Sequence, residues 1–221
     1  VTGSGIIEGD NSYSGGTVID GGKLTVASDK ALGTGDVVLK NHGTLDLSGM
    51  AVSNYINVEG CTLAGAGAYS GIMDVSGNLQ LQDATTAAKV VMLGGGTISG
   101  APLTTTALDV QTDGNATVGG DLTINDNGTI TLNNGSLLEV GGSLTLGNGT
   151  KLVLNGDYAV GTSLLSSTGT LTMGDVSLVY GDSTVELEKQ GNSLVLVSSN
   201  LSTTASYANQ TKKAITNKFI Q

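Results

Sequence analysis

Apolar and polar residues alternate along most of the chain in short stretches. Leu122 and Ile124, for example, flank Thr123. A two-residue period is typical of a β-strand with one buried face, because successive side chains of a strand point to opposite sides. We therefore predict an all-β protein made of many short strands. The alternating pairs are Leu24/Val26, Leu45/Leu47, Ile56/Val58, Leu79/Leu81, Leu108/Val110, Leu122/Ile124, Ile130/Leu132, Leu138/Val140, Leu144/Leu146, Leu152/Leu154, Leu171/Met173, Val185/Leu187 and Leu194/Leu196.

The strand pattern repeats in the middle of the chain. Residues 119–124 read GGDLTI, and residues 141–146 read GGSLTL. Residues 128–132 (GTITL) are followed at nearly the same spacing by residues 149–154 (GTKLVL). Three apolar pairs make one period, which predicts a solenoid with three short strands in each coil of about 22 residues. After Leu122, the pairs of this region begin at near-regular steps, at Ile130, Leu138, Leu144 and Leu152.

Asn-Gly pairs leave an alternative open, because such pairs also close β-hairpins. A hairpin meander does not explain this long-range repeat, whereas in a parallel β-helix each residue stacks on its equivalent in the next coil. We favour a β-helix over residues 1–199, with a sandwich or barrel as the alternative. Its register places Leu122 on Leu144 and Ile130 on Leu152. Some nine coils would form a rod roughly 40 to 45 Å long.

Composition and charge narrow the function. The chain has 221 residues, including 35 Gly and one Pro, and its formal net charge is −10. All nine basic residues are Lys, and nucleic-acid binding needs a positive surface, so we expect no nucleic-acid partner. No apolar run approaches the roughly 20 residues of a membrane-spanning helix. Because Val1 is not an initiator methionine, we expect the sequence to begin inside a longer polypeptide.

A long motif lies near the N-terminus. Residues 11–26 read NSYSGGTVIDGGKLTV, and residues 31–35 read ALGTG. This run closely resembles the passenger-associated transport repeat of bacterial autotransporters, whose pattern is N-T-Y-x-G-G-T-x-I-x-x-G-x-L-x-V followed by A-L-G-x-G. The chain departs from this pattern at Ser12, where the family has Thr. At the level of motifs the resemblance covers about a quarter of the chain, and the remainder is similar in its periodicity alone.

The resemblance implies a single-stranded right-handed parallel β-helix that is exported by type V secretion and displayed outside a Gram-negative cell. It implies a partner as well, the protein's own C-terminal outer-membrane barrel outside this sequence. We expect a non-catalytic passenger module that acts as a structural stalk or adhesin, with a host or glycan receptor as candidate partner. The sequence leaves the oligomeric state open.

A second, shorter likeness lies in residues 200–221, which we expect to form a linker toward the barrel. Residues 209–215 (NQTKKAI) resemble the segment that follows passengers in this family. Tyr207, Ile215 and Phe219 fall on one helical face, and Ser206 is a candidate N-cap. A frayed tail is the alternative.

The enzymatic alternative is a carbohydrate-active β-helix, either a polysaccharide lyase or a glycoside hydrolase. Paired carboxylates from neighbouring coils would be needed, for example from Asp46, Asp74 and Asp109. The chain has no Arg to bind acidic sugars and few aromatic residues to stack on sugar rings. His42, in a predicted turn, has no nucleophile or orienting carboxylate nearby in the sequence. We expect no catalytic residue, no metal ligand and no cofactor or cofactor-binding residue.

Other residue patterns favour structural roles. Cys61, the only cysteine, excludes an internal disulfide and is expected to be buried. Residues 94–97 (GGGT) lack the Asp of the calcium-binding glycine repeat. The outward pairs Thr129/Thr131 and Thr170/Thr172 do not recur on every coil, which disfavours an ice-binding surface. The N-x-S/T triplets are interpreted as turns and begin at Asn115, Asn127, Asn134, Asn148, Asn200 and Asn209.

Apolar residues are denser near the C-terminus than in the Gly- and Ala-rich residues 60–71. In a solenoid, coils with the strongest internal and neighbour interactions nucleate folding. We therefore expect residues 157–197 to stabilise the rest of the chain. The apolar residues of this segment are Tyr158, Val160, Leu164, Leu165, Leu171, Met173, Leu178, Val179, Val185, Leu187, Leu194 and Leu196.

Overall fold

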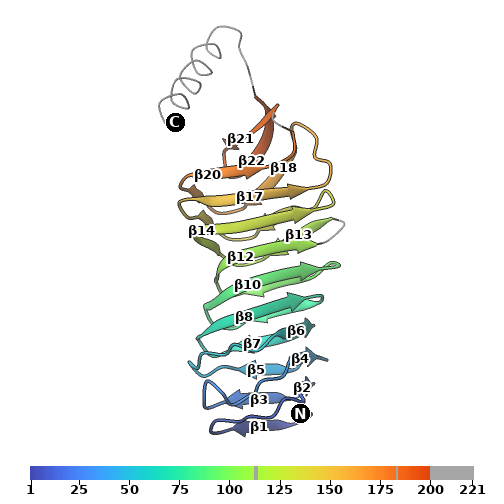
Figure 1. Cartoon of the computed structure of the whole chain (residues 1–221), viewed down its shortest axis with the longest axis vertical. Helices are drawn as coiled ribbons and strands as arrows, with labels where there is room; N and C mark the ends of the chain where they lie inside the picture. The colour runs from blue at the N-terminus through green and yellow to red at the C-terminus, as the bar shows by residue number, and fades with distance from the viewer. Residues whose placement is uncertain (112–113, 183, 200–221) are drawn as a thin grey trace, which may run out of the picture.

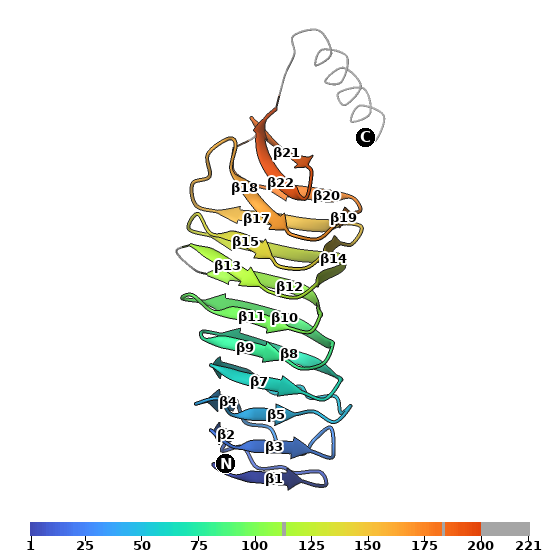
Figure 2. The same ribbon diagram turned by 180° about the vertical axis from the view of Figure 1, so that it is seen from behind.

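The computed structural model describes residues 1–111, 114–182 and 184–199. These residues form a parallel β-solenoid of about eight turns, with about 19 residues per turn and no helix (Figure 1). The N-terminus lies at one end, and the turns stack one above another toward the opposite end (Figures 1 and 2). The predicted all-β parallel solenoid is confirmed. The sandwich and barrel alternatives are wrong.

The turns build two long sheets. Sheet A alternates with sheet B along the chain, so each turn contributes to both (Figure 2). The strands of sheet A are, in spatial order, β1 (Ser4–Ile7), β3 (Lys23–Val26), β5 (Thr44–Asp46), β7 (Cys61–Ala64), β9 (Asn78–Leu81), β11 (Thr97–Gly100), β13 (Asn115–Val118), β15 (Leu137–Val140), β18 (Ser163–Ser167), β22 (Ser193–Ser198) and β21 (Val185–Gln190). The strands of sheet B are β2 (Thr17–Asp20), β4 (Val37–Lys40), β6 (Ile56–Glu59), β8 (Gly67–Val75), β10 (Thr85–Leu93), β12 (Leu103–Gln111), β14 (Leu122–Asn133), β16 (Leu144–Leu146) and β19 (Leu171–Met173), joined by β17 (Thr150–Asn155) and β20 (Val176–Val179).

Strand β14 shows how one turn is divided. Its first part, at Leu122, pairs with β16, and its second part, at Ile130, pairs with β17. In β10 and β12 a register shift falls between the two corresponding parts. A turn in this region therefore contains one strand of sheet A and two paired segments of sheet B. The predicted register is confirmed, since Leu122 pairs with Leu144 and Ile130 pairs with Leu152.

The predicted coil length is wrong for most of the chain, because the turns differ in length. The turns of the N-terminal half are shorter than predicted, since Ser4 pairs with Lys23 and Ile56 pairs with Met73. Near the C-terminus the turn is longer, and Leu144 pairs with Leu171. Only inward-facing residues must align between turns, whereas the solvated corners can gain or lose residues. The repeat seen in the sequence is a property of the middle turns rather than of the fold.

The core is a set of inward ladders that run along the solenoid axis. In sheet B, one ladder places Val37, Ile56, Met73 and Val90 on successive turns, and each is at most 1% exposed. Full burial of such a side chain contributes roughly 1.5–3 kcal/mol. No turn can bury these residues by itself, so the stability of each turn depends on the turns above and below it.

The corners are held by side chains that bind the backbone of the next turn. Asp121 Oδ1 accepts a hydrogen bond from the Ser143 amide at 2.7 Å, and Asp126 Oδ1 accepts one from the Asn148 amide at 2.8 Å. Asn127 has a φ of 57°, in the left-handed region that Asn tolerates better than most residues. The Asn-Gly pairs therefore form corners of the solenoid, where they satisfy or redirect the backbone, and not hairpin loops.

The last strands contradict the expectation that residues 1–199 pair in parallel throughout. β22 pairs antiparallel with β18 and with β21, so the chain ends its sheet A with a hairpin. Leu194 and Leu196 of β22 are fully buried, and Lys189 Nζ donates to the Leu171 carbonyl oxygen at 2.6 Å. The hairpin thus covers apolar residues of the final turn. The linker predicted for residues 200–221 lies outside the described residues.

The inward and outward positions of β16 give a direct test of the stacking. Leu144 is 0% exposed and pairs with two neighbouring turns, whereas Thr145 faces outward between them. We expect Leu144→Asp to lower the free energy of unfolding by more than about 3 kcal/mol, since it leaves a cavity and buries a carboxylate. Thr145→Asp should cost about 1 kcal/mol or less. Denaturant unfolding measures both, and equal midpoints would contradict the assigned faces.

A second prediction concerns which turns are most stable. Of the apolar residues in 157–197, Leu164, Leu165, Leu171, Leu194 and Leu196 are buried, but Val160 and Val179 are exposed. We still expect the slowest native-state amide exchange in β18, β19 and β22, because the hairpin of β21 and β22 covers the C-terminal end of the solenoid.

A chain lacking residues 157–221 should lose cooperative unfolding, and one lacking residues 1–50 should keep it. If the slowest amide exchange lies in β3 and β5 instead, the N-terminal turns and not the C-terminal turns are the most stable.

Candidate functional surfaces

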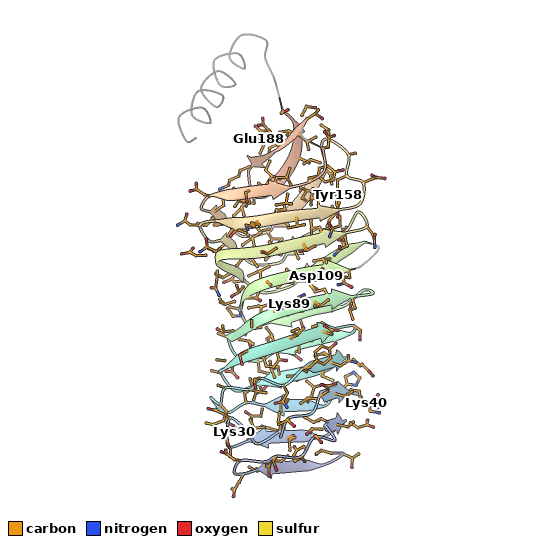
Figure 3. The ribbon with its side chains drawn as sticks, in the orientation of Figure 1. Lys30, Lys40, Lys89, Asp109, Tyr158 and Glu188 are labelled. Carbon is orange, nitrogen blue, oxygen red and sulfur yellow. The ribbon has the colours of Figure 1, made fainter. Side chains whose placement is uncertain are left out.

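The outward carboxylate of Asp109, one of the three that the sequence singled out, binds side chains from neighbouring turns. Asn133 Nδ2 donates to its Oδ1 at 2.8 Å, and Gln111 Nε2 donates to its Oδ2 at 3.0 Å. Lys89 Nζ lies 3.8 Å from Oδ2 and comes from the preceding turn (Figure 3). These contacts join β10, β12 and β14 across the outer face of sheet B. Asp109 therefore serves to hold three turns together.

Asp74 lies in the same outward column as Asp109, with Val91 between them. Two strand spacings place the carboxylates about 10 Å apart. Retaining glycosidases need carboxyl groups about 5–5.5 Å apart, and inverting enzymes need about 6.5–9.5 Å. Asp46 lies in sheet A, where Lys23 Nζ is 2.8 Å from its Oδ2 and holds its pKa below the ordinary value. The structure does not bring the three candidate carboxylates together.

Tyr55 is bound to Asp74 across one turn. The Tyr55 hydroxyl donates to Asp74 Oδ2, and this hydrogen bond, with burial and the charge of Asp74, raises the pKa of Tyr55 to about 12. Tyr55 is 38% exposed as a whole residue, and its side chain extends over the outer face from β6 toward β8 because its hydroxyl is bound to the next turn. The pair was not foreseen, since no sequence spacing predicts which outward residues meet.

His42 and Cys61 line one small hollow of about 80 Å³. Cys61 is 4% exposed and unpaired, as predicted, and burial raises the pKa of its thiol. His42 is exposed and has a φ of 61°, which places it in a corner of the solenoid as predicted. A buried thiol with a raised pKa is a poor nucleophile, so this arrangement favours a structural role for Cys61.

The sequence did not reveal a threonine ladder on the outer face of sheet B. The ladder runs through the first segments of β10, β12 and β14 and continues through β16 and β19. Five outward threonines pair one above another on consecutive turns and are exposed or half-buried. No fixed spacing marks them, because the turns between them differ in length. Only Thr172 belonged to a predicted pair, and the neighbours of Thr131 in its own column are Asp109 and Val153. The ladder consists of Thr86, Thr104, Thr123, Thr145 and Thr172.

The N-x-S/T triplets of the sequence fall partly in corners of the solenoid and partly in strands. Asn127 and Asn134 have positive φ values and lie in corners, as interpreted from the sequence. Asn115 begins β13, where its Nδ2 donates to Glu139 Oε1 at 2.5 Å, so its assignment to a turn is wrong. Asn200 and Asn209 lie outside the described residues.

Open hollows lie toward both ends of the solenoid. One, of about 780 Å³, lies beside β20 and is lined by Asp157, Tyr180 and Asp182, among others. There the rings of Tyr158 and Tyr180 meet edge to face at 6.2 Å. Another, of about 410 Å³, lies along the terminal hairpin of β21 and β22. Toward the N-terminal end, a smaller hollow of about 210 Å³ lies across β2 and β4.

The described residues contain neither a cluster of metal-ligating side chains nor a membrane-spanning helix. In residues 1–111, 114–182 and 184–199, no three His, Cys, Asp or Glu side chains are grouped in a way that could hold a metal ion. No helix in that part of the chain is long and apolar enough to cross a membrane.

Comparison with known proteins finds a partial similarity to an autotransporter adhesin. Over 57 residues the chain is 47% identical to the adhesin BmaC autotransporter of Brucella suis biovar 1 (strain 1330). The resemblance to autotransporters is confirmed. The match covers 24% of this chain and 2% of the relative. No protein-family model matches the chain, and no solved structure matches it.

The bond between Tyr55 and Asp74 gives a test by titration. Asp74→Asn removes the negative charge that opposes ionisation, so the pKa of Tyr55 should fall from about 12 toward 10. Titration of the Tyr55 ring signals by NMR measures the shift. Asp109→Asn, two turns away, serves as the control and should leave the pKa unchanged. An unchanged pKa in Asp74→Asn would contradict the hydrogen bond.

Proposed function

We propose that the chain is a segment of an autotransporter passenger that is displayed on the surface of a Gram-negative cell and acts as a stalk or adhesive surface. The observation that carries the proposal is a parallel β-solenoid whose sequence is similar to part of an autotransporter adhesin. The matched residues span about 2% of that adhesin's length, so the activity of the whole adhesin is not assigned to this chain.

The proposal includes a finer description of the fold. Residues 1–199 form the β-helix segment, and residues 200–221 form the linker toward an outer-membrane barrel outside this sequence. The helix is right-handed, since nearly all connections between parallel strands of one sheet have that hand. Three strand segments per coil, as seen around β14, are its basic unit. The resemblance of residues 11–35 to the passenger-associated transport repeat supports this description of the fold.

Several physical properties support transport of this chain through a narrow pore. A single buried cysteine offers no disulfide that would lock a folded loop before transport. Each turn buries its inward residues against its neighbours, so turns can fold one after another on the outside. Folding would then favour outward movement, because each new turn adds its own burial free energy.

The carbohydrate-active alternative gains no support from these residues. Asp74 is bound by Tyr55, and Asp109 is bound by Asn133 and Gln111, so both carboxylates already have side-chain partners. Asp46 lies in the other sheet. We therefore propose a non-catalytic role, with the outer faces of the sheets as contact surfaces.

Display on cells tests the proposal directly. We would fuse residues 1–221, with an N-terminal epitope tag, to the outer-membrane barrel of an autotransporter in a Gram-negative host. The tag should bind antibody on intact cells and should be lost after external protease treatment. These cells should adhere to host epithelial cells or settle as aggregates more than cells that display the barrel alone.

The matched control carries Thr123→Cys and Thr145→Cys, two outward residues that pair on adjacent turns. A disulfide formed between them before transport should reduce display, and a reducing agent should restore it. A tag that stays protected from antibody in the parent fusion contradicts the proposal. Cleavage of a polysaccharide by the purified chain, abolished by Asp74→Asn or Asp109→Asn, would favour the enzyme instead.

A further inference from the structure

We propose that the outer face of the terminal hairpin binds an arginine side chain of a partner protein. Two valines form the apolar floor of this site, and two glutamates supply its negative charge. The inference rests on the proposed adhesive role and names the partner chemistry that one part of the surface would recognise. All of these residues line a single hollow of about 410 Å³, which is formed by Val160, Glu186, Leu187, Glu188, Val197 and Ser198.

The apolar part of the hollow is held in place by the backbone. Val160 lies in a tight turn, in which the Thr162 amide donates to the Ala159 carbonyl oxygen at 3.1 Å. The following residue, Gly161, has a φ of 91°, which this kind of turn requires of its third residue. The Gly161 amide donates to the Leu196 carbonyl oxygen at 2.7 Å. The turn is thereby joined to β22, and Val160 is left 55% exposed.

The two carboxylates lie on the same outer face as the apolar floor. Leu196 is fully buried, so its neighbour Val197 points outward. Glu186 pairs directly with Val197 across the hairpin, and Glu188 follows two residues later on the same face. Both glutamates are exposed, and Glu188 lies at the C-terminal end of the solenoid (Figure 3). The negative charges therefore lie beside the valines rather than on another side of the hairpin.

In the described part of the chain, no cation balances the charge of these glutamates. Glu188 accepts a hydrogen bond from the neutral Gln190 Nε2 at 2.8 Å, and no side chain binds the Glu186 carboxylate. Lys189 points to the inner face, where it binds the Leu171 carbonyl oxygen. Elsewhere on the solenoid, ion pairs with lysines are formed by Asp10, Asp20, Asp46 and Asp109. A cation from outside would relieve the repulsion between the two like charges.

An arginine suits this hollow better than other cations. Two residues that are two positions apart on a strand lie about 7 Å from each other. The planar guanidinium has five N–H donors, so it can reach the carboxylates of Glu186 and Glu188 together. Its aliphatic stem can lie along Val160 and Val197, as long cationic side chains do on apolar surfaces. A divalent metal ion would need more oxygen ligands than two glutamates provide.

The arginine has to come from another protein. All nine basic residues of the chain are Lys, so neither a second copy nor another segment of the chain supplies an arginine. The volume of the hollow lies within the about 300–1,000 Å³ of small-molecule sites, which leaves room for an apolar side chain beside the arginine. Arginine is also enriched in protein interfaces. The occupant is therefore a basic segment of a partner protein with apolar residues next to its arginine.

Binding can be followed on the isotope-labelled full chain by NMR. The probe is a short acetylated peptide amide with one arginine between two leucines, and the comparison peptides carry lysine, glutamine or glutamate in place of the arginine. We expect the arginine peptide to shift the amide signals of Val160, Glu186, Glu188 and Val197 in a saturable way. The lysine peptide should bind at least about threefold more weakly, and the other two should not bind. High salt should weaken the binding, because the site is exposed.

Matched variants separate the site from the general negative charge of the chain. Glu186→Gln combined with Glu188→Gln should weaken binding at least about fivefold. The control combines Glu8→Gln with Glu59→Gln, two exposed glutamates outside the hollow, and should leave binding unchanged. Thermal unfolding of each variant confirms that the fold is retained.

The apolar floor is tested in the same way. Val160→Ser should weaken binding at least about threefold, because it removes the exposed wall on which the arginine stem lies. Val179→Ser, which changes a similarly exposed valine on β20, should leave binding unchanged. A charge exchange completes the set, since Glu186→Lys with Glu188→Lys should lose the arginine peptide and bind the glutamate peptide.

Several results would overturn the arginine site. They are the absence of a saturable shift with the arginine peptide, equal binding of the lysine peptide, and equal binding by the double glutamine variant and the parent chain. Saturable shifts of the same signals by calcium chloride, beyond those of sodium chloride at equal ionic strength, would assign the hollow to a metal ion. Signals of Glu186 that change with protein concentration would place a second copy there. Signals that change in Lys212→Gln with Lys213→Gln would place the chain's own lysines there.

The outcomes also separate this inference from the proposed function. If the fused chain is displayed and adhesive but the purified chain does not bind the arginine peptide, the arginine site fails while the passenger role stands. If the purified chain binds the peptide through Glu186 and Glu188 but the fused chain is not displayed on cells, the site is retained and the passenger role is overturned.

Discussion

The structure depends on the stacking of inward side chains in register from one turn to the next. A single turn has too little apolar surface to be stable and leaves its backbone amides and carbonyls unpaired. When Leu122 lies on Leu144, and both lie between further turns, the same contact buries their side chains and pairs their strands. The outward residues and the lengths of the corners can vary, provided that the inward residues stay stacked in register.

That constraint explains which parts of the fold could be predicted from sequence. Alternation around Leu122, Ile130, Leu144 and Leu152 identified the strands, their inward faces and their stacking partners, because all of these follow from the buried column. The length of each turn did not follow, because corners such as those between Leu144 and Leu171 are solvated and carry no periodic signal. The antiparallel pairing of β21 and β22 was missed for a related reason, since alternation is the same in parallel and antiparallel strands.

Prediction of the surface was weaker, because outward residues are brought together by turn length rather than by pattern. Asp46, Asp74 and Asp109 resembled one another in sequence, yet Asp46 lies in sheet A and the other two are separated by Val91. Tyr55 meets Asp74 because the turn between them is shorter than the repeat of the middle turns. The threonine ladder passes through turns of several lengths and was hidden for the same reason. A surface of this kind can acquire new contacts by insertion or deletion at a corner while the core remains intact.

The terminal hairpin has a consequence for association between molecules. Parallel solenoids carry unpaired strand edges at their ends, and two such ends could join in register to form a fibre. At the C-terminal end of sheet A the outermost strand, β21, runs antiparallel to β22. Lys189 donates a hydrogen bond to the Leu171 carbonyl oxygen of β19, the last strand of sheet B. A second molecule would meet a strand that carries Glu186 and Glu188 there, both exposed and of like charge. The hairpin therefore acts against end-to-end polymerisation wherever many copies of this solenoid are crowded together.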